Sequence, residues 1–217
     1  MPKRIVKLAS KGLEKIREDP RSLYRFVEAF VKGMAYVVFF RLFRRNVRIK
    51  LPFLVFCKKI TISGPGSVFI DSRCCIFTNS FDRLTIITLS PRAHVKIGKR
   101  CDLGGVTIRC HKRVELGDCV LAASCLLQDS PFLSGQFNRR STTEMDRSLS
   151  SEILIGKSVW LAGQTIVLQG STIGEGSVLS QGSVCFNFIV PRNHLAVGNP
   201  VRRSVSLDVI SNVLRTP

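Results

Sequence analysis

A six-residue period between Ile155 and Cys185 restricts the possible folds of this chain more than any other feature. Counted in sixes from Ile155, every hexad begins with an apolar residue or cysteine, and its fifth residue is small or β-branched. Neither the period of a helix nor the alternation of an ordinary strand gives this pattern. The first positions are Ile155, Leu161, Val167, Ile173, Leu179 and Cys185, and the fifth positions are Val159, Thr165, Ser171, Ser177 and Ser183.

Hexads of this kind predict a parallel β-solenoid. Each hexad supplies one short strand and one tight corner, and three hexads close a triangular coil. Successive coils then stack at about 4.8 Å, so that the apolar positions form a continuous core. A single repeat cannot bury these positions, whereas a stack of repeats can.

The same spacing is present upstream, with interruptions. We therefore expect one solenoid of about six coils from about Ile60 to Phe186. A polar loop from Asp129 to Glu152 interrupts it, and this loop is too long to be a corner. The upstream columns are Ile62, Val68 and Cys74; Val95 with Cys101; Ile97 with Leu103; and Ile108, Val114, Val120 and Leu126.

Positive charge is concentrated at the amino-terminal end. The chain has 33 Lys and Arg against 15 Asp and Glu, a net charge of +18. Of these residues, 14 basic and 4 acidic ones lie in the first 50, which therefore hold +10 of the total. Such an excess predicts attraction to nucleic acid, anionic lipid or anionic substrates.

Two amphipathic helices are expected in this basic segment. The first runs from Ile5 to Ile16 and ends at Asp19-Pro20, because proline disfavours continuation. The second begins near Ser22, with Arg25, Glu28 and Lys32 on its polar side. Only eight uncharged residues separate Lys32 from Arg41, far fewer than the roughly 20 that span a bilayer. The expected apolar side contains Leu23, Phe26, Val27, Phe30, Val31, Met34, Val37 and Val38.

Two interpretations of residues 1–50 remain open. In one, the segment is an interfacial helix on an anionic membrane surface. In the other, the helix packs on its own domain or on a sister subunit and keeps a solvated basic face. Nucleic acid is a less favoured partner, because the basic residues follow a helical period and do not alternate with stacking aromatics. The basic residues that would lie near anionic lipid are Arg41, Arg44, Arg45, Arg48 and Lys50.

The cysteines and histidines do not indicate a metal site. The start of the chain lacks an apolar signal region, so we expect the eight cysteines to be reduced thiols in the cytoplasm. No C-x-x-C pair occurs, and Cys119 and Cys125 fall at the repeat spacing as expected core residues. A β-helix carbonic anhydrase would need three histidines converging on zinc. The spacings of the three histidines present do not favour this, and no metal is expected.

The hexads resemble a known family. The run VWLAGQTIVLQGSTIGEGSVLSQGSV, followed by AVGNP at Ala196 to Pro200, is similar to the hexapeptide-repeat acyltransferases, most of all to sugar O-acetyltransferases of surface-polysaccharide biosynthesis. The resemblance covers roughly residues 60 to 205. It implies an all-β solenoid, the left-handed parallel β-helix, and a homotrimer. The expected segments are a basic helical extension (1–50), the β-helix acyltransferase domain (51–205, with loop 129–152) and a tail (206–217).

The resemblance also implies a co-substrate and the residues that contact it. Members of this family use acetyl-CoA or another acyl-CoA, which lies in the groove between neighbouring β-helices. The positions of this chain that match cofactor-contacting ones are Gly163, Gln181 and Arg202. A small residue lets the pantetheine chain approach the backbone, and an arginine can bind phosphate bidentately.

For catalysis, the family commonly carries a histidine in a pattern resembling D-S-D-F-H at the start of the long loop. This chain has Asp129, Ser130, Pro131, Phe132 and Leu133 there, so leucine stands at the histidine position. Phe186 and Asn187 likewise stand where the family often has Thr-Lys.

Among His94, His111 and His194, the best candidate for the general base is His111, together with Asp129. Arg139 and Arg140 in the loop are candidates for binding an anionic sugar or phosphate, although solvated loop charge explains them equally well.

Together these features predict an acyl-CoA-dependent O-acyltransferase that acts on a sugar hydroxyl in surface polysaccharide or glycolipid biosynthesis. Its partners would be acyl-CoA and a sugar acceptor. Its expected location is the cytoplasm, at the inner face of the cytoplasmic membrane if residues 1–50 bind lipid. The alternative is a non-catalytic β-helix scaffold or regulatory partner that has lost the catalytic histidine.

Overall fold

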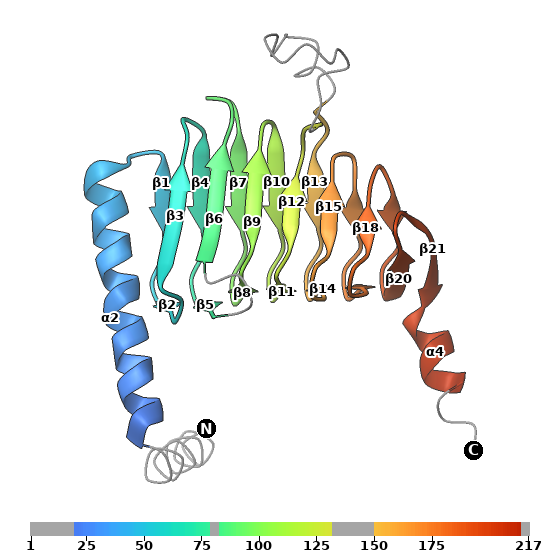
Figure 1. Cartoon of the computed structure of the whole chain (residues 1–217), viewed down its shortest axis with the longest axis horizontal. Coiled ribbons are helices and arrows are strands. Elements are labelled where there is room, and N and C mark those ends of the chain that lie inside the picture. Colours follow the sequence, from blue (N-terminus) through green and yellow to red (C-terminus); the bar gives the residue numbers. More distant parts are fainter. Residues whose placement is uncertain (1–19, 79–82, 132–149, 214–217) are drawn as a thin grey trace, which may run out of the picture.

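The computed structural model describes residues 20–78, 83–131 and 150–213, which form one long helix followed by a parallel β-solenoid (Figure 1). The helix, α2 (Pro20–Phe43), stands at the amino-terminal end of the coil stack. Short strands then follow in threes, one for each of three sheets. The chain ends, within the described residues, in a short helix, α4 (Leu207–Val213).

Three sheets form the sides of the solenoid, and we name them A, B and C. Sheet A contains β1 (Val47–Ile49), β4 (Ser67–Ile70), β7 (His94–Ile97), β10 (Arg113–Leu116), β13 (Ile153–Ile155), β16 (Thr172–Ile173) and β19 (Ile189–Val190). Sheet B contains β2 (Phe53–Val55), β5 (Cys74–Phe77), β8 (Asp102–Gly104), β11 (Leu121–Ala123), β14 (Trp160–Leu161), β17 (Val178–Leu179), β20 (His194–Gly198) and β21 (Val201–Ser206). Sheet C contains β3 (Lys59–Ser63), β6 (Arg83–Thr88), β9 (Thr107–Cys110), β12 (Leu126–Gln128), β15 (Ile166–Leu168) and β18 (Val184–Cys185).

Each coil is one strand from each sheet, in the order A, B, C. Six coils are complete, and β19 and β20 begin a seventh, on which β21 folds back antiparallel to β20. All other pairings are parallel and join each strand to the strand one coil away; Val167, for example, pairs with Cys185, the residue three hexads later. The predicted fold class, an all-β solenoid of hexapeptide repeats with a helical amino-terminal extension, is confirmed.

The hexad positions form the core as predicted. All first-position residues from Ile155 to Cys185 are at most 4% exposed, and the fifth-position residues are at most 1% exposed. Two of the buried serines, Ser177 and Ser183, form hydrogen bonds with the next coil. Ser177 Oγ donates to Pro191 O at 2.6 Å and accepts from His194 N at 3.0 Å. The interior of the solenoid therefore contains both stacked apolar side chains and serine hydroxyls that form hydrogen bonds with neighbouring corners.

Three details of the sequence prediction are wrong. The solenoid begins at Val47, well before Ile60. Leu126 faces outward and is half-buried, because Leu127 occupies the inward place and pairs with Ile108 and Val167. Cys125 is buried, as expected, whereas Cys119 sits in a corner with a positive φ of 60° and is only half-buried.

The chain turns between sheets at three edges of the triangular solenoid. The A–B edge is the column of corners that includes residues 156–159, the B–C edge includes residues 162–165, and the C–A edge includes residues 111–112. Most of the long loop expected at residues 129–152 lies outside the described residues; it leaves the solenoid at the C–A edge.

Helix α2 packs on the first coil through small and aromatic residues. Ala29 and Phe40 are at most 4% exposed, and a side chain at Gly33 would collide with the carbonyl oxygen of Phe53. Tyr36 Oη accepts a hydrogen bond from Ile60 N at 3.1 Å. Most of the apolar residues expected on one side of the helix are exposed. The first expected helix, Ile5 to Ile16, lies outside the described residues. Within the described part, no helix meets the length and hydropathy that a membrane span requires.

Candidate functional site

The B–C edge carries two of the three residues expected to contact acyl-CoA. Gly163 and Gln181 occupy this edge in successive coils, where Gly182 N donates to Gly163 O at 3.0 Å. A Cβ atom added at Gly163 would meet no atom within 4 Å, and the same holds for Gly182. The backbone of this edge is therefore open to a ligand.

The third expected residue, Arg202, lies at the carboxyl-terminal end of the same edge. Ser180 N donates to Ala196 O at 2.9 Å, which stacks β20 on the coil that contains Gln181. Gly198 N donates to Ser183 Oγ at 3.3 Å and pairs with Val201 at the start of β21. Arg202, the next residue, is exposed. The structure thus aligns Gly163, Gln181 and Arg202 along one edge.

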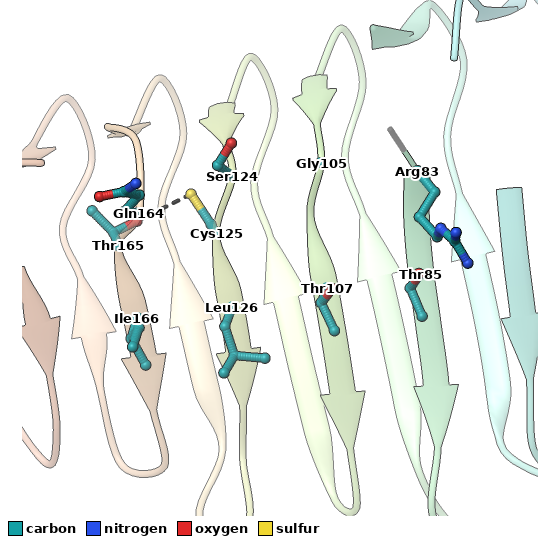
Figure 2. A pocket seen from close by; sticks show the side chains of 10 residues that line it. All are labelled: Arg83, Thr85, Gly105, Thr107, Ser124, Cys125, Leu126, Gln164, Thr165 and Ile166. Atoms are coloured by element: carbon teal, nitrogen blue, oxygen red, sulfur yellow. Dashed lines mark hydrogen bonds between the residues drawn. The ribbon is translucent and has the colours of Figure 1, made fainter. Parts of the chain in front are cut away.

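A cavity of about 650 Å³ opens beside this edge on the outer face of sheet C (Figure 2). Strands β6, β9, β12 and β15 supply its floor, and corner residues of the B–C edge supply its rim. The hydroxyl of Ser124, which is 8% exposed, has no hydrogen-bond partner within the described residues. The lining residues are Arg83, Thr85, Gly105, Thr107, Ser124, Cys125, Leu126, Gln164, Thr165 and Ile166.

Sequence reasoning missed this cavity. Its floor consists of outward residues that alternate with the buried column of sheet C, and the assignment of Leu126 to that column concealed them. The alternation expected of a strand would have revealed the cavity once the register was correct.

Cys125 in this cavity is a neutral thiol. Thr165 Oγ1 donates to Cys125 Sγ at 3.0 Å, and burial raises the pKa of the thiol above its usual value. A nucleophilic cysteine instead needs a lowered pKa. The cavity therefore favours binding over covalent catalysis by Cys125.

The C–A edge carries the candidate catalytic residues, and its carboxylate is fully engaged with the backbone. Asp129 is 0% exposed. It accepts N–H bonds from His111 at 2.6 Å, from Lys112 at 2.6 Å and from Arg113 at 2.8 Å. Successive backbone N–H groups of this kind form an anion-binding nest. Asp129 therefore fixes the corner that carries His111, and it does so through the backbone of that corner.

Cys110 lies beneath the same carboxylate. Its Sγ donates to Asp129 Oδ2 at 3.5 Å. Burial first, and then the charge of Asp129, raise the pKa of the Cys110 thiol, which stays protonated. The Asp129 carboxylate therefore accepts hydrogen bonds from the corner at residues 111–112, from Arg113, and from Cys110 at the end of β9.

The half-buried side chain of His111 lines a second cavity, of about 520 Å³. The charged residues that line it are basic, Arg92 and Lys112, and Glu152 beside it forms ion pairs with Lys112 at 3.8 Å and with Arg113 at 3.3 Å. Ser150 Oγ, also in the lining, has no hydrogen-bond partner within the described residues. The remaining lining residues are Leu89, Ser90 and Pro91.

The two cavities lie at opposite ends of strand β9. Thr107 lines the first cavity and His111 lines the second. Four residues of extended chain span about 13 Å, whereas direct proton transfer needs a heavy-atom separation of roughly 2.6–3.2 Å. Within one chain, His111 is therefore not in reach of a group bound at the B–C edge.

The other two histidines are held by neighbouring groups. His94 Nδ1 lies 2.9 Å from Ser67 Oγ, and His194 Nδ1 lies 2.6 Å from Arg192 O. Leu133, Arg139 and Arg140 lie outside the described residues. Across residues 20–78, 83–131 and 150–213, no three His, Cys, Asp or Glu side chains form a group suited to a metal ion.

Comparisons with known proteins find sequence relatives over part of the chain. No family model matches. Putative acetyltransferase SACOL2570 of Staphylococcus aureus is 47% identical over 64 residues, which are 29% of this chain and 32% of the relative. Putative acetyltransferase C18B11.09c of Schizosaccharomyces pombe is 50% identical over 50 residues, 23% of this chain and 24% of the relative. The match therefore spans about a third or less of the length of these curated relatives.

Solved structures with a similar arrangement include several acyltransferases. The polySia specific acetyltransferase NeuO has a TM-score of 0.47 and 18% identity, over 74% of this chain and 76% of that one. A galactoside acetyltransferase in complex with coenzyme A has a TM-score of 0.41 and 19% identity, over 83% and 80%. AntD, an N-acyltransferase from Bacillus cereus, in complex with dTDP and 3-hydroxybutyryl-CoA, has a TM-score of 0.43 and 18% identity, over 76% and 88%.

The sequence and the fold agree on one resemblance. The hexads form the stacked coils that they predict, and a stretch of 64 residues is similar to curated relatives named as acetyltransferases. The resemblance of this chain to the hexapeptide-repeat acyltransferases is confirmed.

Proposed function

We propose that this protein is an acyl-CoA-dependent O-acyltransferase, with acetyl-CoA as its donor and a sugar hydroxyl as its acceptor, in surface polysaccharide or glycolipid biosynthesis. The observation that carries the proposal is the 47% identity over 64 residues with a relative named as an acetyltransferase. The open B–C edge supports it, because a thioester donor needs a backbone that it can approach closely.

The donor lies along the B–C edge in this proposal. Arg202 binds a phosphate of the CoA at the seventh coil, and the pantetheine arm passes Gln181 and Gly163. Ser124 belongs to the fourth coil, next to β11. Arg202 lies in β21, four strand spacings from β11 in sheet B, or about 19 Å along the stack. An extended pantetheine arm covers such a span and delivers the thioester to the cavity beside Ser124.

The reaction is an acyl transfer. The acceptor hydroxyl oxygen attacks the thioester carbonyl carbon, an oxygen–carbon bond forms, and the carbon–sulfur bond breaks. A neutral histidine takes the hydroxyl proton during the attack and returns it to the leaving CoA thiolate. Backbone N–H groups hold the negative charge that develops on the carbonyl oxygen. His111 is the proposed base, and Asp129 is the residue that positions it.

The separation of the two edges supports a homotrimer. One chain keeps His111 about 13 Å from the B–C edge cavity along strand β9. If the C–A edge of one protomer lies against the B–C edge of the next, His111 reaches the donor of its neighbour. The family resemblance implies the same arrangement, with acyl-CoA between neighbouring β-helices.

The second cavity suits the acceptor. Its lining combines His111 with two basic side chains and a buried hydroxyl that has no partner among the described residues. This lining favours a polyhydroxylated ligand that also bears negative charge. Arg139 and Arg140 are proposed to contribute from the loop. We place the reaction in the cytoplasm, at the inner face of the cytoplasmic membrane.

The test is turnover with purified full-length protein. Acetyl-CoA is incubated with candidate sugar acceptors, and the released CoA thiol is measured together with the mass of the product. Acceptor-dependent thiol release and a product heavier by one acetyl group support the proposal. If CoA does not bind and no acceptor is acetylated, the proposal is wrong.

A mixing experiment tests the shared site. The Arg202→Ala and His111→Ala variants, each weak alone, are mixed, dissociated and reassembled. Mixed oligomers contain some interfaces in which both residues are intact, so activity recovers if each site uses two protomers. If activity does not recover although mixed oligomers form, each chain carries a complete site.

The second candidate function is a non-catalytic scaffold or regulatory partner. Leu133 at the expected histidine position favours it, as does the commitment of Asp129 to the backbone. In that case the double variant Arg202→Ala/His111→Ala leaves glycan modification in cells unchanged, whereas deletion of the whole chain abolishes it.

A further inference from the structure

Helix α2 has a bare apolar face opposite the face that packs on the solenoid. The packed residues, Ala29, Gly33, Tyr36 and Phe40, follow one another at intervals of three and four. A second stripe with the same spacing lies on the other side of the helix. Every member of that stripe is at least 42% exposed, and its members are Leu23, Val27, Val31, Met34, Val38 and Leu42.

The stripe lies in a strongly basic segment. From residue 20 to residue 50 there are eight Lys and Arg and a single acidic residue, Glu28, which pairs with Lys32 at 2.6 Å. The basic residues gather at the carboxyl end of the helix and just beyond it. They are Arg21, Arg25, Lys32, Arg41, Arg44, Arg45, Arg48 and Lys50.

A basic cavity adjoins the stripe at this end. It has a volume of about 470 Å³ and lies between α2 and β1. Val37, Val47 and Ile49 supply apolar surface, while its charged lining residues are three arginines, Arg41, Arg45 and Arg48. A guanidinium cluster of this kind suits a phosphate group.

The charge and the apolar stripe of α2 indicate which partner covers this face of the helix. A second copy would bring the same positive charge against itself, which opposes association. A continuous apolar stripe beside basic side chains matches an interfacial helix in the headgroup region of a bilayer. We propose that α2 docks on an anionic bilayer, with its stripe at the acyl boundary and a lipid phosphate in the cavity of Arg41, Arg45 and Arg48.

This docking fixes how the solenoid stands on the membrane. The helix caps the first coil, contacts β1 and β2, and runs across the solenoid axis (Figure 1). If its outer face lies on the bilayer, the coil stack rises from the surface with its amino-terminal end down. The fourth coil is then about 14 Å above the first. This consequence rests on the proposed function, for which it implies an acceptor sugar carried on a membrane lipid.

The first experiment is co-sedimentation of the full chain with vesicles, without acyl-CoA or acceptor. Phosphatidylglycerol-containing vesicles at low salt should bind it, and pure phosphatidylcholine vesicles should bind it at least ten-fold less. Val31→Asp/Val38→Asp and Arg41→Glu/Arg45→Glu should each reduce binding at least ten-fold. The control variants, Val209→Asp and Lys157→Glu, change exposed residues outside α2. They should bind the anionic vesicles as well as the native chain does.

Several outcomes would overturn the proposal. The first is no binding to anionic vesicles, and the second is equal binding by the α2 variants and the controls. A fall in oligomer mass with Val31→Asp/Val38→Asp, measured by light scattering, would assign the stripe to a second copy.

Because Arg41 and Arg45 are exposed, the Arg41→Glu/Arg45→Glu variant should fold even if the aspartate variant does not. Acetylation of a water-soluble acceptor would persist in either case, so failure of docking is distinguishable from failure of the proposed function.

The orientation has its own test, because the chain contains a single tryptophan. Trp160 lies in the fifth coil and is 48% exposed. Its fluorescence should be unaffected by brominated lipids, since four coil spacings place it about 19 Å above the first coil. In a Trp160→Phe background, Met34→Trp should be strongly quenched. Quenching of Trp160 equal to that of the Met34→Trp variant would contradict the upright orientation.

Discussion

The B–C and C–A edges are built from the same kind of hexad corner, yet they are suited to different tasks. At the B–C edge, Gly163 and Gly182 leave the backbone uncovered. Beside them lies a cavity in which the hydroxyl of Ser124 has no partner within the part of the chain that the structure describes. At the C–A edge, the buried carboxylate of Asp129 accepts hydrogen bonds from three backbone N–H groups. The backbone of the B–C edge is therefore uncovered, as the proposed donor site requires. At the C–A edge the backbone N–H groups are occupied by Asp129, so only the side chains that line its cavity face the proposed acceptor.

The third edge shows that openness is not a general property of these corners. At the A–B edge, a Cβ atom added to Gly156 would lie 2.7 Å from Glu175 N in the next coil. Close stacking requires a glycine at 156, whereas a Cβ atom added to Gly163 would lie within 4 Å of no atom of the described residues. The difference supports a ligand-binding explanation for the small residues of the B–C edge.

The largest effect is expected at His111. His111→Ala should reduce kcat by about 10²–10⁴-fold, because a general base is lost. The free energy of unfolding should change little, because the corner uses only the backbone N–H of this residue. Steady-state kinetics and urea unfolding check both. His94→Ala is the control, and an equal loss of kcat in both variants would remove His111 as the base.

The next effect concerns Asp129. Asp129→Ala leaves three partly buried N–H groups without their acceptor, and such a loss costs about 1–3 kcal/mol for a buried group. We expect urea unfolding to show a loss of about 3 kcal/mol or more, with a smaller loss for Asp129→Asn, which keeps one acceptor oxygen. If the alanine variant is as stable as the native chain, the description of the C–A edge as a locked corner is wrong.

A smaller effect is expected at Arg202. A hydrogen bond to a charged group contributes about 1.5–3 kcal/mol, so Arg202→Ala should weaken CoA binding roughly ten- to hundred-fold. Isothermal titration with CoA measures this directly. Arg203, the next residue of the same strand and also exposed, provides the control. Equal losses in Arg203→Ala would mean that the strand attracts CoA by its overall charge alone.

The smallest effects are expected for alanine substitutions at two glycines, Gly156 and Gly163, which should differ in what they change. Gly156→Ala should lower the free energy of unfolding by about 1–3 kcal/mol, because the added methyl overpacks the A–B edge. Gly163→Ala should leave stability nearly unchanged but weaken CoA binding several-fold. Thermal unfolding and CoA titration of both variants make the comparison. If Gly163→Ala binds CoA normally, the pantetheine arm does not pass that position.

The fold followed from the sequence because its period is local and repeated. Each hexad from Ile155 to Cys185 shows the same inward positions, and all of them are buried. Upstream, a shift of one residue exchanges the inward and outward faces of a strand. That shift put Leu126 in the place of Leu127 and hid the cavity beside the B–C edge.

Other features depended on contacts that no local pattern shows. The family resemblance pointed to Gly163 and Gln181. Nothing in the local sequence showed that the carboxylate of Asp129 binds the backbone N–H groups of the preceding C–A corner. In α2, the apolar side expected from the sequence left open whether the helix packs on the solenoid or lies on a membrane. The helix packs through Ala29 and Gly33, since small residues allow its backbone to approach Phe53 closely.

A crystal structure with CoA bound is the sharpest test, because we assign the donor to a single edge of the solenoid. We predict the pantetheine arm against Gly163 and Gln181, a CoA phosphate at Arg202, and the sulfur near Ser124, facing His111 of a neighbouring protomer. CoA bound along the C–A or A–B edge, or no CoA bound at saturating concentration, would contradict the account.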